Sequence, residues 1–225
     1  MTMRADARLR SIAEFVPRGS RVADIGTDHA QLAIELIASG RATHVIAADL
    51  NVGPLEAARK NISDAGLSKQ IETRLGDGLK VLRAGEVDVV CIAGTGGALM
   101  CEILSNDIST TIRRLILQPM NVSDRVRNWL EQNDWEIIDE DLAEVGGIIY
   151  EIICAVNRRL DQTEVTRQTK RSQSPLLSRL REKRLEKLRR ISTSMERSTR
   201  AVYSDKYRQL RAEIGELERQ LDGNG

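Results

Sequence analysis

The sequence predicts a doubly wound α/β domain with a seven-stranded sheet, followed by a coiled-coil-like helical hairpin. Over residues 1–157, short runs rich in valine, isoleucine and leucine alternate with amphipathic helical stretches. Such alternation is typical of βαβ units with right-handed crossovers. Residues 158–225 instead show helical periodicity and an excess of basic residues. We therefore divide the chain into one domain at 1–157 and a second at 158–225.

Seven segments of the first domain are expected to be strands. Five are almost continuously apolar, as strands buried on both faces of a parallel sheet are: residues 21–25, 44–50, 71–75, 87–93 and 114–118. Two more runs, 135–145 and 147–156, meet at Gly146-Gly147 and predict an antiparallel hairpin at the sheet edge.

Helices are expected before and between these strands. Residues 7–16 form an amphipathic lead-in helix that ends before Pro17 and Gly19. Apolar residues recur with helical spacing in four further stretches: 28–39, 53–65, 97–105 and 123–133.

The second domain is expected to begin with a polar linker at 158–175, followed by a basic helix at 176–199. A second helical run carries a seam at alternating spacings of four and three: Tyr203, Tyr207, Leu210, Ile214, Leu217 and Leu221. A seam this short is not stable alone, so it needs a partner helix. The expected partner surface is on the preceding helix: Leu177, Leu180, Leu188, Ile191 and Met195.

Composition excludes several protein classes. Hydrophobic residues are 41% and charged residues 30% of the 225, which is typical of a globular chain. The three cysteines contain no CxxC pair, so neither a disulfide scaffold nor a zinc site is expected. No run approaches the ~18 apolar residues of a transmembrane helix, and no apolar stretch follows the basic N-terminal residues. We expect a cytoplasmic monomer without a metal or a membrane partner.

The near-neutral net charge hides an asymmetry. Residues 1–157 carry 16 Lys and Arg against 23 Asp and Glu, a charge of −7, whereas residues 158–225 carry 18 against 10, a charge of +8. A basic tail on an acidic body favours contact between the tail and a polyanion. The alternative is a solvated helical face that balances the charge of the body.

The segment VADIGTDHA (22–30) ends the first strand and opens the next helix. Only Gly26 is present there, so the GxGxxG fingerprint of NAD and FAD sites is absent, as is a phosphate-binding P-loop. A carboxylate at this turn, Asp24, suits a cationic ligand better than a phosphate. Two structural alternatives stay open: Asp24 fixes the turn, and Asp28 caps the helix.

The ends of the next three strands complete a pattern. Asp49 ends the second strand, where an acid can bind both hydroxyls of a ribose. Asp77 lies between two glycines after the third strand, where an adenine edge is expected, and the glycine-rich IAGTGG (92–97) ends the fourth. This ordered set predicts an S-adenosylmethionine site and a class I methyltransferase with a Rossmann-like sheet.

The same segments resemble one bacterial family. GTDHA, DLNVGPLEAARKN, RLGDGL, IAGTGG and RLILQP follow successive strands or lie on them, and YEII lies near the domain end. This set is similar to the tRNA (adenine22-N1)-methyltransferases, which end in a basic helical domain. The resemblance implies S-adenosylmethionine as cofactor, tRNA as partner and the following cofactor-binding residues: Asp24, Ile25, Gly26, Asp28, His29, Asp49, Leu50, Asp77, Gly78, Ala93, Gly94, Gly96 and Gly97. Gln31, Thr95 and Met120 depart from the residues usual in the family.

Transfer of an activated methyl group to the free lone pair of adenine N1 needs no obligatory base, so alignment and water exclusion are the expected means. Because N1 lies on the Watson–Crick edge, a paired adenine must first be opened or flipped. Asp28 and His29 are the candidate catalytic residues, orienting the base or its exocyclic amine. The alternative is that they only hold the cofactor.

The basic tail is expected to bind tRNA phosphates without reading sequence. The candidate contacts are Lys170, Arg171, Arg179, Arg181, Lys183, Arg184, Lys187, Arg189 and Arg190. Two alternatives stay open: a methyltransferase acting on another RNA or on a small molecule, and an RNA-binding relative that has lost turnover.

Overall fold

The computed structural model describes residues 5–105, 111–160, 170–197 and 199–222. The chain divides into two compact units, Met1–Ser172 and Gln173–Gly225. This division lies later in the chain than the boundary drawn from the sequence after residue 157. Residues 161–169 of the predicted linker lie outside the described residues.

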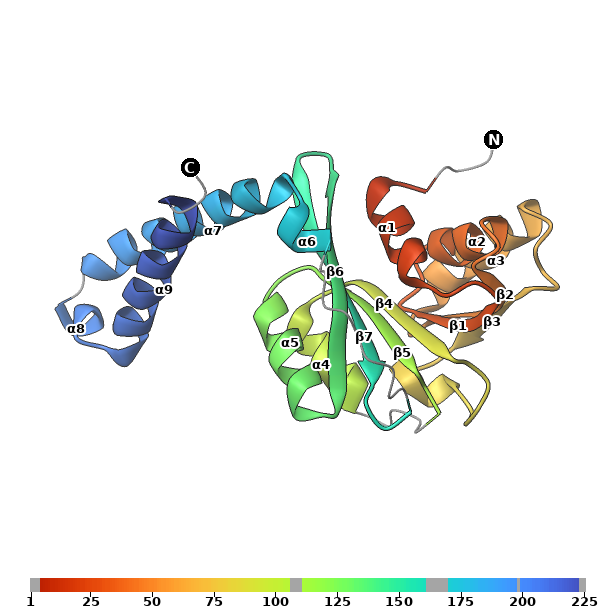
Figure 1. The fold of residues 1–225 in the computed structure, drawn as a ribbon. Coiled ribbons are helices and arrows are strands. Elements are labelled where there is room, and N and C mark those ends of the chain that lie inside the picture. The colour runs from red at the N-terminus through yellow and green to blue at the C-terminus, as the bar shows by residue number, and fades with distance from the viewer. Residues whose placement is uncertain (1–4, 106–110, 161–169, 198, 223–225) are drawn as a thin grey trace. The chain divides into compact units, whose positions relative to one another are not determined.

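The first unit contains one seven-stranded sheet (Figure 1). Its strands are β1 (Ser20–Ile25), β2 (Ala42–Asp49), β3 (Ile71–Leu75), β4 (Val89–Thr95), β5 (Arg114–Pro119), β6 (Trp135–Val145) and β7 (Ile148–Asn157). The spatial order is β3-β2-β1-β4-β5-β7-β6, and only β7 runs antiparallel to its neighbours β5 and β6. The predicted fold class is confirmed, including the terminal hairpin with Gly146 and Gly147 at its turn.

Helices cover both faces of the sheet. Apolar residues of α1 (Ala7–Phe15), α2 (Gln31–Ala38) and α3 (Val52–Asp64) pack in one cluster, whereas α4 (Gly97–Ser105), α5 (Ser123–Gln132) and the short η1 (Gly78–Val81) belong to another. Neighbouring strand residues alternate between the clusters: Val22 faces the first and Ala23 the second. Because both faces are buried, the sequences of the central strands β1, β2, β4 and β5 are close to continuously apolar, whereas the edge strand β3 has one buried residue, Ile71.

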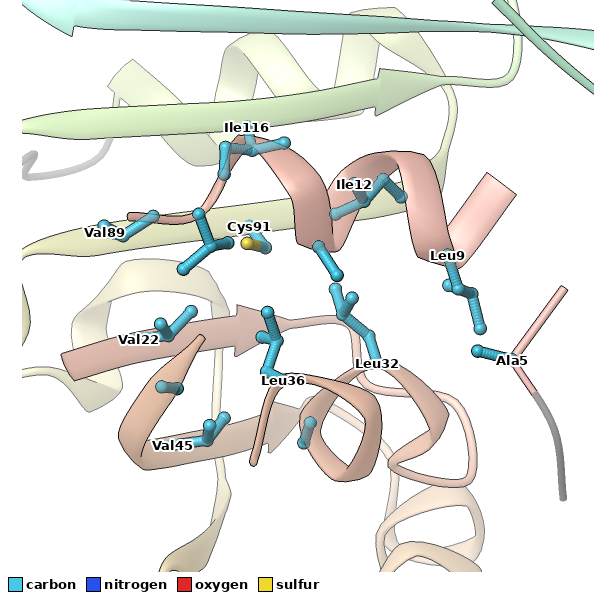
Figure 2. Packing of buried hydrophobic residues seen from close by; sticks show 14 of the residues in the cluster. Ala5, Leu9, Ile12, Val22, Leu32, Leu36, Val45, Val89, Cys91 and Ile116 are labelled. Atoms are coloured by element: carbon cyan, nitrogen blue, oxygen red, sulfur yellow. The ribbon is translucent and has the colours of Figure 1, made fainter. Parts of the chain in front are cut away.

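Figure 2 shows how α1 closes the first of these clusters. Leu9 and Ile12 of α1 belong to the same cluster as Leu32 and Leu36 of α2, and the Leu9 side chain extends toward Ala5. All four are buried, so the lead-in helix is an integral part of the domain, where it contacts α2 and the strands β5, β6 and β7.

The start of α2 differs from the prediction. The helix begins at Gln31 rather than at residue 28, because His29 and Ala30 adopt the left-handed conformation at φ 57° and 54°. Its N-cap is Ala30, which makes no side-chain capping hydrogen bond. The alternative that Asp28 caps this helix is therefore wrong.

The second unit is a helical hairpin. After the short α6 (Lys170–Gln173), which spans the division between the units, come α7 (Leu176–Glu196), α8 (Thr199–Val202) and α9 (Asp205–Asp222). Four buried residues form the centre of the α7–α9 contact: Leu185, Leu210, Ile214 and Leu217. Four partly buried residues pack around them: Leu188, Met195, Tyr207 and Leu221. No helix in the described parts of the chain is long and apolar enough to cross a bilayer.

Four positions predicted for the seam and its partner surface lie outside the packed α7–α9 cluster: Leu177, Leu180, Ile191 and Tyr203. Tyr203 is 81% exposed and Ile191 is 38% exposed. The reason is that α8 and a turn occupy residues 199–204, so the packed face of α9 begins at Tyr207. Leu185, which the sequence analysis did not choose, faces α9 instead.

Candidate functional site

A cavity of about 410 Å³ lies where the order of the sheet reverses, at the carboxyl ends of β1 and β4. Doubly wound sheets bind their ligands at this switch point. Ten residues predicted to bind the cofactor line it: Asp24, Ile25, Gly26, Asp28, Asp49, Leu50, Asp77, Gly78, Ala93 and Gly94.

Asp24 is the buried acid of the cavity, with 4% of its surface exposed. Burial raises the pKa of its carboxyl to about 6, although the hydrogen bond from Thr27 and the charge of Arg8 lower it. The Thr27 hydroxyl donates to Oδ2 at 2.8 Å. Asp24 thus fixes the turn after β1 and also lines the cavity.

Asp49 and Asp77 lie on the next two loops of the cavity wall. Oδ1 of Asp49 accepts hydrogen bonds from the backbone and side-chain nitrogens of Asn51, at 2.7 and 3.3 Å. Oδ2 of Asp77 lies 2.6 Å from Nζ of Lys80, and its side chain is 56% exposed. Both carboxylates are therefore reachable by a polar ligand.

Asp28 and His29 form a pair at the edge of the site. Nε2 of His29 lies 3.2 Å from Oδ1 of Asp28, and the two side chains are 49% and 81% exposed. Asp28 lines the cavity, whereas His29 is not part of its lining. The left-handed backbone at His29 is stabilised by a hydrogen bond from Asn61 Nδ2 to its carbonyl, at 3.0 Å.

Gly96 and Gly97 lie outside the lining and contact the loop after β5. The backbone nitrogen of Gly97 donates to Oδ1 of Asn121 at 3.2 Å. A Cβ on Gly97 would lie 2.6 Å from the Asn121 carbonyl oxygen. A side chain at position 97 is excluded because the backbone at Gly97 lies against the backbone at Asn121.

Replacing Gly97 by alanine is therefore expected to destabilise the first unit by about 1–3 kcal/mol, because two backbone segments must separate. The matched control is Gly53→Ala in α3, where nothing lies within 4 Å and φ is not positive. That change should be neutral or stabilising by about 0.5–1 kcal/mol. Urea unfolding of both variants is the measurement, and equal midpoints would contradict the contact.

Several cavity residues were not predicted from the sequence. Arg8 and Leu9 come from α1, where a lead-in helix gives no signal of a site. Four others lie one or two positions from predicted residues: Ala48, Asn51, Gly76 and Leu99. Leu32 and Ile103 lie farther along α2 and α4. Of the three departures from the family pattern, Gln31 and Thr95 line the cavity, whereas Met120 lies outside the lining and is 49% exposed.

The candidate RNA contacts differ in their surroundings. Arg184 and Arg189 pair with Glu213 and Glu218 of α9, at 2.6 and 2.7 Å. Arg181 is half-buried. Four other candidates are exposed: Arg179, Lys183, Lys187 and Arg190. The Lys170 side chain lies outside the described residues.

Arg171 is held inside the first unit rather than presented to solvent. Its Nη2 lies 2.9 Å from Oε2 of Glu151 and its Nη1 lies 3.6 Å from Oε2 of Glu140. The same two carboxylates bind Arg127 of α5. A role for Arg171 in phosphate contact would require this pairing to break.

Within the described ranges, no group of three or more His, Cys, Asp or Glu side chains is arranged to hold a metal ion. The cysteines Cys91, Cys101 and Cys154 are buried thiols. Burial raises the pKa of the Cys91 thiol well above its ordinary value, so it is not a nucleophile at neutral pH.

Comparison with known proteins agrees with this geometry. The sequence pattern of a family described as a methyltransferase domain matches residues 5–153. A tRNA (adenine(22)-N(1))-methyltransferase of Bacillus subtilis is 39% identical over 155 residues, which are 68% of this chain and 65% of that protein. The aligned region thus spans slightly under two thirds of that relative.

Two solved structures resemble the whole chain. A putative tRNA (m1A22) methyltransferase of Streptococcus pneumoniae in complex with S-adenosyl-L-methionine matches with a TM-score of 0.82 and 30% identity, over 97% of this chain and 100% of that one. TrmK of M. capricolum in complex with S-adenosyl-homocysteine matches with a TM-score of 0.80 and 26% identity, over 97% and 98%. Together with the carboxylate-lined cavity of this chain, these matches confirm the predicted family: the chain belongs to the methyltransferase-domain proteins and, among them, to the bacterial tRNA (adenine22-N1)-methyltransferases.

Proposed function

We propose that this protein transfers a methyl group from S-adenosylmethionine to N1 of the adenine at position 22 in the D-arm of tRNA. The observation that carries the proposal is the cavity at the switch point. Acids from the ends of three successive strands line it: Asp24, Asp49 and Asp77. Family membership supports the same reaction and the same substrate.

The residues present fit this cofactor. The Asp24 carboxylate would bind the methionyl ammonium, Asp49 the ribose hydroxyls, and Asp77 with Gly78 the adenine edge. A Cβ at Gly78 would lie 3.1 Å from Ile103, so glycine keeps this part of the wall open. A cavity of about 410 Å³ lies in the range of small-molecule sites, roughly 300–1,000 Å³.

The chain's own contribution to the reaction is alignment. The bound cofactor supplies a methyl group that its sulfonium already activates, and adenine N1 offers a lone pair. Ala93 and Gly94 at the end of β4 would face the transferred group, with Asp28 and His29 at the cavity edge orienting the base. The flipped adenine would exclude water from the site.

The C-terminal unit would hold the tRNA through its phosphates. Exposed basic side chains of α7 suit this role because a phosphate contact needs charge rather than a fixed fork geometry. A monomeric state and a cytoplasmic location stay predictions from the sequence.

The direct test is to incubate the full-length protein with labelled S-adenosylmethionine and unmodified tRNA, and to map the methyl group by nucleoside digestion and primer extension. A 1-methyladenosine at position 22, absent when that adenine is replaced by guanosine, is the expected result. Methyl transfer to another position would overturn the assigned target, and no transfer to any tRNA would overturn the proposed reaction.

The basic side chains of α7 lead to a separate prediction. Reversing two exposed charges of α7, Lys187→Glu with Arg190→Glu, is expected to weaken tRNA binding about 10-fold or more at low salt and to reduce its salt dependence. S-adenosylhomocysteine affinity should not change. Lys69→Glu, an exposed position before β3 and thus at the sheet edge away from the cavity, is the control. Filter binding at several salt concentrations measures the effect, and equal slopes for the variants would contradict a phosphate-binding face.

A further inference from the structure

Helices α4 and α5 lie side by side on one face of the sheet (Figure 1), and a groove of about 570 Å³ runs between them. Leu99 lines both this groove and the cavity at the switch point, so the two spaces adjoin. None of the proposed cofactor-binding residues belongs to the lining of the groove. The groove is therefore a second space next to the cavity, with its own set of side chains.

The polar side chains of the groove suit a nucleotide. Arg125 is exposed, and no carboxylate of the described residues pairs with its guanidinium. Asn128 and Gln132 are exposed amides farther along α5, and Glu102 is an exposed acid on α4. A guanidinium binds phosphate, whereas amides and a carboxylate bind the edges of bases.

Trp129 is the aromatic residue of the groove. It is half-buried, because it packs against the second apolar cluster and also lines the groove. Its Nε1 donates to Oγ of Ser105 at 2.9 Å, and that hydroxyl donates to the carbonyl of Cys101 at 2.7 Å. These bonds fix the ring before a ligand arrives, so a base can stack on it at a small cost in entropy.

The spacing of the two main groups fits a single nucleotide. Arg125 and Trp129 are four residues apart on α5. This spacing places them on one face of the helix, about 6 Å apart along its axis. A phosphate at Arg125 and a base stacked on Trp129 can therefore belong to the same nucleotide.

Exposed apolar side chains lie where the cavity meets the groove. Leu99, Met120 and Val122 are each about half exposed. The Met120 nitrogen donates to the carbonyl of Thr95 at 2.9 Å, and Cγ2 of Val122 lies 3.1 Å from the Cβ position of Gly97, so both flank the segment that joins β4 to α4. Val122 is also held at φ 43°, a conformation that β-branched residues rarely adopt. Exposed apolar surface and local strain together are typical of a binding site.

We propose that the α4–α5 groove binds a nucleotide next to the acceptor adenine in the RNA, with its phosphate on Arg125 and its base stacked on Trp129. This inference rests on the proposed function, since the acceptor base would lie in the cavity on the other side of Leu99. A paired adenine must leave its stack before N1 can react, and a stacking surface for its neighbour stabilises the opened strand. The groove thus gives the acidic first unit its own contact with RNA, separate from the basic side chains of α7.

The test combines a change in the protein with a change in the RNA. An abasic nucleotide beside the acceptor adenine keeps the phosphate and removes the base. At one of the two neighbours it is expected to raise the KM of the wild-type protein for tRNA about 10-fold. Trp129→Leu should raise the KM for intact tRNA by a similar factor, and the abasic nucleotide should then change it by no more than about 2-fold. An abasic effect of equal size on both proteins would overturn the stack.

Arg125→Gln tests the phosphate contact at an exposed position, where the change should not disturb folding. It is expected to raise the KM for tRNA about 3- to 10-fold and to reduce the salt dependence of binding. Arg113→Gln is the matched control, because Arg113 is an exposed arginine just before β5, at the opposite edge of the sheet. S-adenosylhomocysteine affinity should stay unchanged in all three variants. Equal KM values for Arg125→Gln and Arg113→Gln would overturn the contact.

A spectroscopic measurement does not depend on methyl transfer. Trp135 is 2% exposed, so quenching of tryptophan fluorescence by RNA reports on Trp129. In the presence of S-adenosylhomocysteine, tRNA is expected to quench the wild-type protein and to leave Trp129→Leu nearly unchanged. Quenching in a wild-type protein that methylates no tRNA would overturn the proposed function and leave the groove as an RNA site. Methyl transfer to tRNA without quenching would overturn the role of the groove alone.

Discussion

Replacing Asp24 by asparagine is expected to weaken S-adenosylhomocysteine binding roughly 100-fold, because a buried charged hydrogen bond to the ligand ammonium is lost. The same change should not weaken the ligand-free fold above pH 6, since it removes a carboxylate that burial disfavours in its charged form. Affinity falls while stability does not, and this separates a binding role from a structural one. Calorimetry and urea unfolding measure the two effects.

The pH dependence of binding follows from the same residue. Burial raises the pKa of Asp24 to about 6, with Asp49 raising it further and Thr27 and Arg8 lowering it. The ionised form binds an ammonium, so affinity should fall by up to about 10-fold per pH unit below pH 6 and level off above it. The asparagine variant should show no such step. A flat profile for the wild-type protein between pH 5 and 8 would contradict the assignment.

In the ligand-free protein, folding stability changes with pH in the opposite direction to ligand affinity. Because the folded pKa of Asp24 lies above its ordinary value of 3.8, the protonated carboxyl favours the folded state. This contribution is fully present below pH 3.8 and is lost as the pH rises through about 6. Ligand and proton therefore compete for the same side chain. Asp28→Asn, at a largely exposed carboxylate, is the control and should not change how folding stability depends on pH around the pKa of Asp24.

The second large effect is expected at Arg127, where Arg127→Ala should destabilise the first unit by about 3–5 kcal/mol. Its Nη2 lies 2.6 Å from both Glu140 and Glu151, and all three side chains are at most 16% exposed. Ser123 donates to the other oxygen of Glu151 at 2.6 Å. Without Arg127, Glu140 and Glu151 stay buried and keep their pairing with Arg171 alone among these two arginines. The effect is large because the cost of burying two carboxylates is then poorly compensated.

Urea unfolding followed by tryptophan fluorescence measures this loss in the first unit alone, because Trp129 and Trp135 lie in α5 and β6. Arg21→Ala is the control: it breaks an ion pair with Asp88 that is exposed on both sides, so the loss should be much smaller. Equal losses for the two variants would show that burial does not govern the strength of these pairs.

Burial raises the pKa of Glu151, but Arg127, Ser123 and Arg171 together hold it below the ordinary value of 4.5. The stabilisation that Glu151 provides is therefore present above pH 4.5 and is lost as the pH falls below it. The wild-type protein should lose more stability on acidification than Arg127→Ala does.

Several features could be predicted from the sequence because the causes are local. Four of the five parallel strands are close to continuously apolar because both of their faces are buried, so the sequence alone predicts their positions; β3 at the sheet edge has one buried residue, Ile71. The acids Asp24, Asp49 and Asp77 lie within two residues of the ends of β1, β2 and β3. Parallel strands place their carboxyl ends at one edge, so three separate motifs could be assigned to one cavity.

Other features depend on which segments meet in three dimensions. Periodicity places Arg8 on an amphipathic helix, but only the packing of α1 beside β5 and β7 brings it to the cavity. Gly97 has the sequence context of a ligand loop, yet it is glycine because the Asn121 backbone approaches it. Charge alone assigned Arg171 to a solvent-exposed basic face, whereas two carboxylates of the terminal hairpin bind it.

The sequence by itself thus determined the strand pattern, the two-part organisation and the acidic residues at the strand ends, because hydrophobic periodicity and turn chemistry depend on near neighbours in the chain. The tertiary structure decided which charges are buried, which are paired and which face the ligand. Those properties arise from residues far apart in the chain, such as Arg8 and Gln118, which are 110 positions apart, and near-neighbour patterns carry no information on such contacts.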